Sequence, residues 1–268
     1  MSSNAIDSAK SAVSSTGLTS NQSNLDASAY SEKLGTLTAE LSAGTLKKQL
    51  RAVHELAVLG AEGENALVEF LYLRMDPQNP QQPTAAHGRA YQLIYGGSSA
   101  VAKGFIDEFP AGLVCPRSAK NIDYSELQML LVQQDYQGAD KLTSQKLCEL
   151  AGESALQRKW VYFTEVEQLP ALDLMAIDII WGLYSEDKFG WSKQRALWSR
   201  LGKDWERLWP QLSWKTESAW TRYPAEFTWD LSAPVGHLPL SNQLRGVRTM
   251  SALLSHPVWT QGNFSDDA

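Results

Sequence analysis

Residues 214–248 read WKTESAWTRYPAEFTWDLSAPVGHLPLSNQLRGVR and combine a dense group of aromatic residues with a short row of polar and cationic ones. The aromatic residues are Trp214, Trp220, Tyr223, Phe227 and Trp229. The polar row is Asn242, Arg245 and Arg248. Aromatic side chains supply apolar contact area, and arginine donates paired hydrogen bonds to carboxylates. The stretch is therefore typical of a site for a flat apolar ligand with acidic groups at one edge.

Helical geometry separates the two kinds of residue in the last part of this stretch. At about 100° per residue, one helix face gathers Leu240, Leu244, Val247, Met250 and Leu254. The row of Asn242, Arg245 and Arg248 then falls on the opposite face. A solvated polar face is the simpler explanation of such a row, and the neighbouring aromatic residues favour a binding site.

Composition excludes several classes of protein. The chain has 268 residues, a formal net charge of −6 and a pI of about 5.3, which argues against binding to duplex nucleic acid. Its two cysteines, Cys115 and Cys148, indicate no disulfide framework, and Cys148 falls among apolar helical positions typical of a core. No apolar run approaches the roughly 18 residues of a membrane-spanning helix, and the start shows no secretory signal pattern.

The distribution of tryptophan divides the chain into two parts. All ten tryptophans lie between Trp160 and Trp259. Residues 1–35 are rich in Ser, Ala and Asn without apolar periodicity, which predicts a disordered tail. A plastid transit peptide is the alternative, but the first arginine is Arg51 and acidic residues are present. Apolar periodicity predicts a small helical bundle over 36–110.

A second helical unit follows the bundle. Residues 109–122 hold two prolines and a glycine, which predicts a linker at 111–122. Helical periodicity resumes over 123–259 and predicts an all-helical core domain, with a flexible tail at 260–268. The segment Leu172–Tyr184 is apolar apart from two aspartates, which predicts a central buried helix.

Catalytic and metal-binding motifs are absent from the sequence. No Gly-rich nucleotide loop, zinc cluster or nucleophile elbow occurs. A single histidine in a helix is usually structural or solvated, as we expect for His54 and His87. His237 lies in a loop, where it could ligate a metal or metalloporphyrin, but capping of a turn is the favoured interpretation.

The C-terminal half resembles the genomes uncoupled 4 family, the porphyrin-binding regulators of magnesium chelatase. The resemblance covers Tyr124 to Trp259 and rests on four blocks in the same order: LQMLLVQQDYQGADKLTSQKLCELAG, QRKWVYFTEVEQLPALDLMAIDIIW, KFGWSKQRALW and SAWTRYPAEFTWDLSAPVGHLPLSNQLRGVR. The N-terminal bundle is similar to that of the cyanobacterial members. The resemblance implies an all-α fold, with an N-terminal helical bundle followed by a core whose long loops form a cupped cleft.

The same resemblance implies the ligands and the residues that hold them. The ligands are protoporphyrin IX and Mg-protoporphyrin IX, with no cofactor and no metal site. Carried over to this sequence, the propionate-binding residues are Asn242, Arg245 and Arg248. The residues along the apolar cleft are Phe163, Val166, Trp191, Tyr223 and Phe227. Some members have Trp at Tyr223 and Arg at Ser144, so this chain is expected to differ from them in porphyrin affinity more than in porphyrin identity.

The resemblance also implies a role and a location. The chain is expected to be a monomeric, non-catalytic activator whose partner is the large porphyrin-binding subunit of magnesium chelatase in chlorophyll biosynthesis. It is expected in the cyanobacterial cytoplasm with peripheral thylakoid association, or alternatively in the chloroplast. Two other functions stay open from the residues alone: a helical interaction scaffold whose tryptophans only fill a core, and an enzyme acting on tetrapyrroles.

Overall fold

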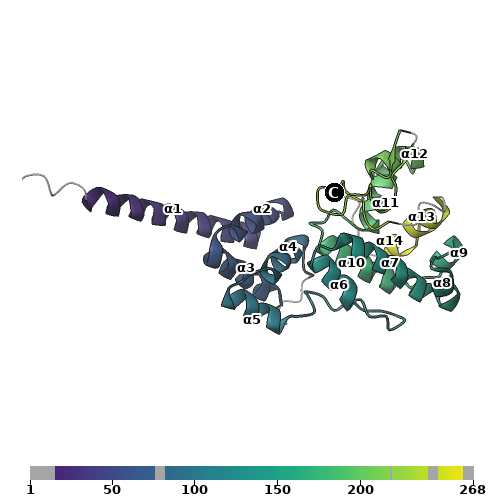
Figure 1. Cartoon of the computed structure of the whole chain (residues 1–268), viewed down its shortest axis with the longest axis horizontal. Coiled ribbons are helices and arrows are strands. Elements are labelled where there is room, and N and C mark those ends of the chain that lie inside the picture. The colour runs from purple at the N-terminus through teal and green to yellow at the C-terminus, as the bar shows by residue number, and fades with distance from the viewer. Residues whose placement is uncertain (1–15, 76–81, 218, 241–246, 262–268) are drawn as a thin grey trace, which may run out of the picture.

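Helices carry almost the whole fold of this computed structural model (Figure 1). The structure describes residues 16–75, 82–217, 219–240 and 247–261, with the backbone alone at 16–27 and 261. The N-terminal half contains α1 (Thr16–Ala43), α2 (Leu46–Ala57), α3 (Gly60–Met75), α4 (Ala85–Tyr95) and α5 (Ala100–Glu108). The fold is mostly helical, as predicted.

The C-terminal half adds nine helices within the described residues and one small hairpin. Its first helices are α6 (Ser125–Val132), α7 (Tyr136–Ala151), α8 (Glu153–Arg158), α9 (Phe163–Val166) and α10 (Ala171–Leu183). They are followed by α11 (Trp191–Arg200), α12 (Trp205–Gln211), α13 (Val247–Leu254) and α14 (Val258–Gln261). The hairpin joins β1 (Lys215–Thr216) to β2 (Ala219–Trp220) in antiparallel register, with Lys215 opposite Trp220.

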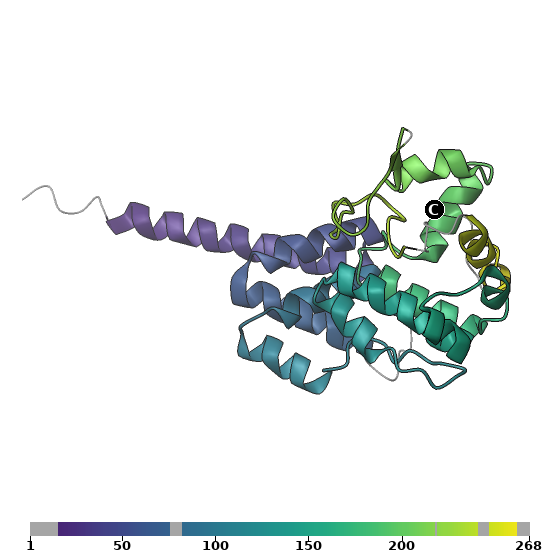
Figure 2. The ribbon, with the colours of Figure 1, turned by 45° about the vertical axis from the view of Figure 1, so that its right-hand side comes forward.

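The N-terminal helix corrects one sequence-based expectation. Residues 1–35 were expected to form a disordered tail, but α1 begins at Thr16 and projects from the bundle as a long helix (Figures 1 and 2). Only its end packs against α2, through the buried Leu37 and Leu41. The preceding turns continue the same helix without an apolar face, so periodicity could not reveal them. Residues 1–15 lie outside the described residues.

The bundle of α2 to α5 is built around buried apolar side chains, including Leu56, Leu71, Tyr91 and Phe105. His87 is part of this packing, because its ring stacks on Phe70 at a centroid distance of 4.1 Å. Burial, together with the charge of Arg74, lowers the pKa of His87 to about 4. His87 is therefore a neutral structural histidine, as its isolated position in a helix predicts.

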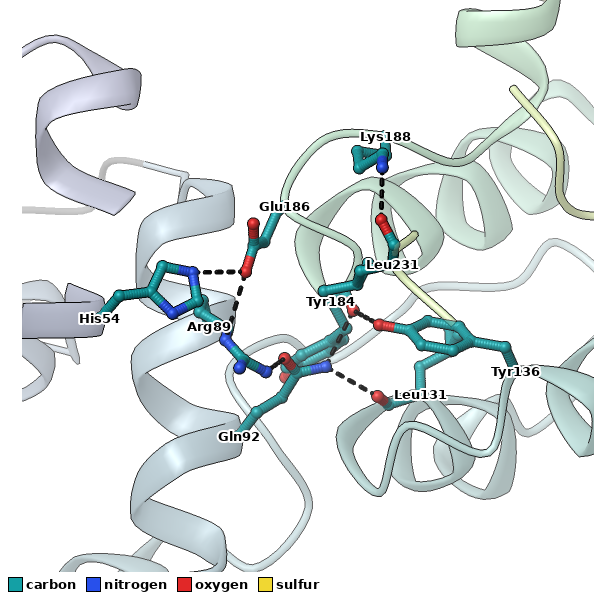
Figure 3. Close-up of polar contacts among 9 residues, drawn as sticks. All are labelled: His54, Arg89, Gln92, Leu131, Tyr136, Tyr184, Glu186, Lys188 and Leu231. Atoms are coloured by element: carbon teal, nitrogen blue, oxygen red, sulfur yellow. Dashed lines mark hydrogen bonds and ion pairs between the residues drawn. The ribbon is translucent and has the colours of Figure 1, made fainter. Parts of the chain in front are cut away.

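Helix α4 joins the bundle to the C-terminal half. Gly88 of α4 lies so close to α10 that an added Cβ would be 1.9 Å from the carbonyl oxygen of Leu183. Gln92 of α4 donates hydrogen bonds to the carbonyl oxygens of Leu131 (2.9 Å) and Tyr184 (2.8 Å) (Figure 3). The buried apolar residues of both halves therefore form one continuous core.

Charged side chains also connect the two halves of the chain at this junction (Figure 3). Glu186, which follows α10, lies 2.8 Å from Nε2 of His54 in α2 and 3.2 Å from Nε of Arg89 in α4. The segment 111–122 is also tied to the core, because the backbone N–H of Leu113 donates to the Tyr184 hydroxyl at 2.9 Å. The domain boundaries at 36–110, 111–122 and 123–259 stay a prediction.

Helix α10 is the central buried helix that the sequence predicts. Its two aspartates are satisfied inside the core, which explains why an apolar helix can hold them. Asp173 accepts hydrogen bonds from the Tyr124 hydroxyl (2.7 Å) and from the Ala119 N–H (3.0 Å). Asp178 accepts one from the Ser192 N–H at 2.9 Å, and burial raises its pKa. Both carboxylates therefore serve the packing.

Candidate functional site

An open groove lies between α9 and α13 and contains two of the predicted site residues. The guanidinium carbon of Arg248 lies 5.6 Å from the centroid of the Phe163 ring. Arg248 is exposed and Phe163 is half-buried, so a cation and an aromatic face are both accessible. The groove has a volume of about 390 Å³ and is lined by Phe163, Glu167, Val247, Arg248, Ser251, Ala252 and Ser255.

The short helix α9 holds Phe163 in place through a network at its N-terminus. Glu165 accepts a hydrogen bond from the Tyr162 N–H at 2.8 Å, and Arg158 donates to both oxygens of Glu165 at 2.7 Å and 2.8 Å. The guanidinium of Arg158 also lies 4.4 Å from the Tyr162 ring centroid. Burial alone would raise the pKa of Glu165, but these hydrogen bonds and the charge of Arg158 lower it. The network fixes a helix too short to be stable by itself.

A second aromatic group comes from the loop that follows the hairpin. The ring centroid of Tyr223 lies 6.3 Å from that of Phe227 and 5.8 Å from that of Trp229. Phe227 is buried, whereas Tyr223 is 45% exposed, so Tyr223 is the accessible member of the group. The loop thus presents a phenol ring on a packed aromatic base.

His237 packs against this aromatic group and holds its loop through hydrogen bonds. Its Nδ1 lies 2.5 Å from the Leu212 carbonyl oxygen, its Nε2 accepts a hydrogen bond from the Thr228 N–H at 3.3 Å, and its ring lies 5.5 Å from Phe227. Burial lowers the pKa of His237, although the bond to Leu212 opposes the shift. Both ring nitrogens are used within the fold, so His237 caps the loop as predicted.

Asp140 of α7 is a site-adjacent residue that the sequence does not reveal. Its side chain is buried, and its carboxylate accepts a hydrogen bond from the Leu240 N–H at 2.6 Å. Burial raises the pKa of Asp140 to about 7, although the Leu240 bond and Lys141 lower it. Burial, followed by the charge of Asp140, also raises the pKa of Tyr223. Asp140 therefore anchors the backbone just before residues 241–246.

The structure brings the predicted site residues together in two groups. Phe163 and Arg248 share the groove, and Tyr223 and Phe227 share the aromatic loop. Neither Tyr223 nor Phe227 lines the groove of Arg248.

The other predicted residues are less accessible or not described. Val166 and Trp191 are each 1% exposed, so their side chains are covered. The indole N–H of Trp191 is buried with no hydrogen-bond partner in the described part of the chain. Asn242 and Arg245 lie outside the described residues. Val247 is 38% exposed, contrary to the expectation that it faces the core, and it lines the groove instead.

The remaining tryptophans of the stretch differ in their roles. Trp214 is fully buried and donates its indole N–H to the His237 carbonyl oxygen at 2.9 Å, so it belongs to the scaffold. Trp220 is 44% exposed on β2, so it does not belong to the buried scaffold. Among the described residues, no three His, Cys, Asp or Glu side chains gather as metal ligands. Within those residues, none of the helices combines the length and apolar content that crossing a membrane requires.

Comparison with known proteins assigns both halves of the chain. Residues 117–257 match the GUN4-like family, and residues 25–110 match the ARM-like repeat domain described as GUN4-N terminal. This chain belongs to the GUN4-like family. The family predicted from the four sequence blocks, the genomes uncoupled 4 family, is confirmed.

Individual relatives of this GUN4-like chain extend the comparison. A Ycf53-like protein from Synechocystis sp. is 45% identical, over 86% of this chain and 98% of that protein. The structure of GUN4 from Chlamydomonas reinhardtii is 34% identical with a TM-score of 0.52, over 55% of this chain and 95% of that chain. A protein named tetrapyrrole-binding protein, chloroplastic, from Arabidopsis thaliana is 36% identical over 51% of this chain and 55% of that protein.

Proposed function

We propose that this GUN4-like chain binds protoporphyrin IX and Mg-protoporphyrin IX and stimulates magnesium chelatase without catalysing a reaction itself. The observation that carries the proposal is the pairing of the Arg248 guanidinium with the Phe163 ring at 5.6 Å, on the rim of an open groove. A porphyrin has an aromatic macrocycle and two carboxylates on one edge, and this pair matches both features. The name of the Arabidopsis relative, which specifies tetrapyrrole binding, supports the same ligand class.

Each predicted residue has a role in this proposal. Arg248, with Arg245 and Asn242, holds the propionates of the ligand. Phe163 and Tyr223 contact the macrocycle from α9 and from the aromatic loop. The buried Phe227 supports the Tyr223 ring. Val166 and Trp191, whose indole N–H has no partner among the described residues, form the covered apolar base.

The magnitudes show which interaction dominates. If binding removes roughly 300 Å² of apolar macrocycle from water, the gain is about 7 kcal/mol. A hydrogen bond from arginine to a propionate adds about 1.5–3 kcal/mol when desolvated, and about 0–1 kcal/mol when exposed. Arg248 is exposed, so the lower range applies to it. Burial of the ring therefore sets affinity, and the arginines orient the ligand and select for an acidic edge.

The partner in this proposal is the large porphyrin-binding subunit of magnesium chelatase, and the location is the cyanobacterial cytoplasm with peripheral thylakoid association. The buried aspartates of α10 are engaged by Tyr124, Ala119 and Ser192, which disfavours their use in an acid–base reaction. A carrier and activator fits this arrangement better than an enzyme.

The rate of magnesium chelatase tests the proposal. Purified chelatase subunits are assayed at limiting porphyrin or magnesium, with and without this protein. We expect the wild-type chain to raise the rate and the Arg248→Ala variant to require more porphyrin for the same effect. A rate that is the same with and without the wild-type chain would contradict the proposed function.

A further inference from the structure

A second and larger hollow lies on another part of the molecule, where the N-terminal bundle meets the core. Its volume is about 840 Å³. Leu46 and the residues around Thr84 contribute from the bundle, whereas α10, α11, Val235 and Trp259 contribute from the core. The hollow shares no lining residue with the groove of Arg248. We call it the junction groove.

The floor of the junction groove carries exposed apolar side chains. Ile179 of α10 is 38% exposed, and Val235 in the loop before α13 is 45% exposed. The buried Leu183 and Trp259 extend this apolar surface. Large apolar side chains that remain exposed inside a hollow indicate a surface that gains stability when a partner covers it.

One side of the junction groove is basic, although the chain as a whole is acidic with a net charge of −6. Helix α11 reads WSKQRALWSR and contains no acidic residue. Lys193, Arg195 and Arg200 of this helix line the groove. Lys193 pairs with Asp187 at 2.6 Å, whereas Arg200 is exposed and makes no ion pair within the described part of the chain. This side therefore complements an acidic partner.

The buried acid of the junction groove is already engaged within the protein. Small-ligand sites combine apolar walls with a few buried polar groups aimed at the ligand. Here the buried acid, Asp178, is occupied by the Ser192 N–H at 2.9 Å. An apolar floor with one cationic side instead matches a polypeptide whose apolar face is flanked by acidic residues, as in the docking of an amphipathic helix into a groove.

We infer that the junction groove binds an acidic amphipathic segment of the large subunit of magnesium chelatase, an inference that rests on the proposed function. Ile179 and Val235 contact the apolar face of that segment, and Arg200 contacts its acidic flank. Because the groove is formed by both halves of the chain, the N-terminal bundle contributes to this docking surface. The porphyrin groove stays free when the segment is bound.

Replacing an apolar residue and a cationic residue of the junction groove by glutamate tests whether the segment docks there. The variant Ile179→Glu/Arg200→Glu changes two exposed side chains. The matched control is Val101→Glu/Lys103→Glu, because Val101 and Lys103 are likewise an exposed apolar residue and an exposed cation, on α5. Both full-length variants are checked for folding by thermal unfolding. Affinity for the purified large subunit and quenching by deuteroporphyrin are then measured for both.

We expect the groove variant to bind the large subunit at least about tenfold more weakly than the wild type, while the control variant is unchanged. We expect deuteroporphyrin to bind all three proteins with affinities within about twofold of one another, because the junction groove shares no lining residue with the groove of Arg248. Equal subunit affinity in the groove variant and the wild type would overturn the inference while leaving the proposed function intact. A wild-type chain that neither binds nor stimulates the chelatase would overturn both.

Other possible occupants of the junction groove would give different experimental results. Wild-type self-association that disappears in the groove variant would assign the groove to a second copy of the chain and overturn the inference. Removal of residues 262–268 that lowers the thermal stability of the wild type but not of the groove variant, with equal affinity of both for the large subunit, would assign the groove to that segment of the chain and overturn the inference.

Discussion

The guanidinium of Arg248 on α13 lies 5.6 Å from the centroid of the Phe163 ring on α9. The contact joins two helices that the sequence separates widely, and it places a cation at the edge of an aromatic surface. For a ligand with an apolar ring and acidic substituents, the ring contact and the charge contact can form together.

Replacement of Arg248 by alanine should weaken porphyrin binding without abolishing it. The side chain is exposed, so its bond to a propionate is worth up to about 1 kcal/mol, which corresponds to about a fivefold change in Kd. The Kd for deuteroporphyrin is measured by fluorescence titration. Arg117→Ala removes an exposed arginine outside the groove and serves as the control. Complete loss of binding in Arg248→Ala would show that charge, not ring burial, sets affinity.

Filling the groove should do more harm than removing the cation. Ser251 is half-buried and lines the groove, so Ser251→Trp places an indole where the macrocycle would lie. We expect affinity to fall by more than about tenfold, because the loss affects the contribution of ring burial. Ser251→Ala controls for loss of the hydroxyl. If Ser251→Trp binds deuteroporphyrin as well as the wild type, the ligand does not use this groove.

The Glu165→Gln variant should destabilise the protein at neutral pH and lose that effect in acid. The folded-state pKa of Glu165 is lowered, so its stabilisation is present above the pKa of the unfolded chain and disappears as pH falls through the folded-state value. Denaturant unfolding at pH 7 and at pH 3 measures the difference between wild type and variant. We expect a difference of up to about 1 kcal/mol at pH 7 that shrinks at pH 3. An equal difference at both pH values would contradict an ionised Glu165.

Asp140→Asn should change stability in the opposite direction. Burial raises the pKa of Asp140 to about 7, so the folded state favours the protonated acid. Its contribution to the free energy of unfolding is fully present below the pKa of the unfolded chain, falls as pH rises, and is lost above about pH 7. Asparagine keeps an oxygen for the Leu240 N–H and carries no charge.

Unfolding at pH 5 and pH 8 tests this prediction for Asp140. We expect the stability of the Asn variant relative to wild type to increase between these values by at most a few kcal/mol. The other buried aspartates are present in both proteins, so their titration cancels in the comparison. Parallel stability curves for the two proteins would contradict a buried acid that titrates near pH 7.

Sequence patterns predicted the elements whose apolar residues recur at helical spacing. Helix α10 was predicted differently, from an almost wholly apolar run, and most of its apolar residues are buried. The middle of α1 is the opposite case, since residues 28–33 are exposed and carry no apolar stripe. Their helical state follows from continuation of the packed turns around Leu37 and Leu41, which is a property of the tertiary structure.

In the candidate site, too, some features are visible in the sequence and others depend on the tertiary structure. Phe163, Arg248 and Tyr223 lie within recognisable sequence blocks, which is why the sequence alone could propose them as site residues. The bond between Asp140 and Leu240 could not be predicted, since it joins residues 100 positions apart and neither residue stands out locally. The pairing of His54 with Glu186 spans 132 positions and was likewise invisible, although His54 was expected to be structural or solvated. Long-range polar contacts of this kind depend on the assembled fold.

Quenching of tryptophan fluorescence by a porphyrin tests whether the core binds this ligand beside Arg248. All ten tryptophans lie between Trp160 and Trp259, so a porphyrin bound to the core lies near them. The wild-type chain is titrated with deuteroporphyrin beside an Arg245→Ala/Arg248→Ala double variant. We expect saturable quenching of the wild type and a shift of the double variant to higher porphyrin concentration. Unquenched emission, or identical titration curves for the two proteins, would contradict a porphyrin site at this position.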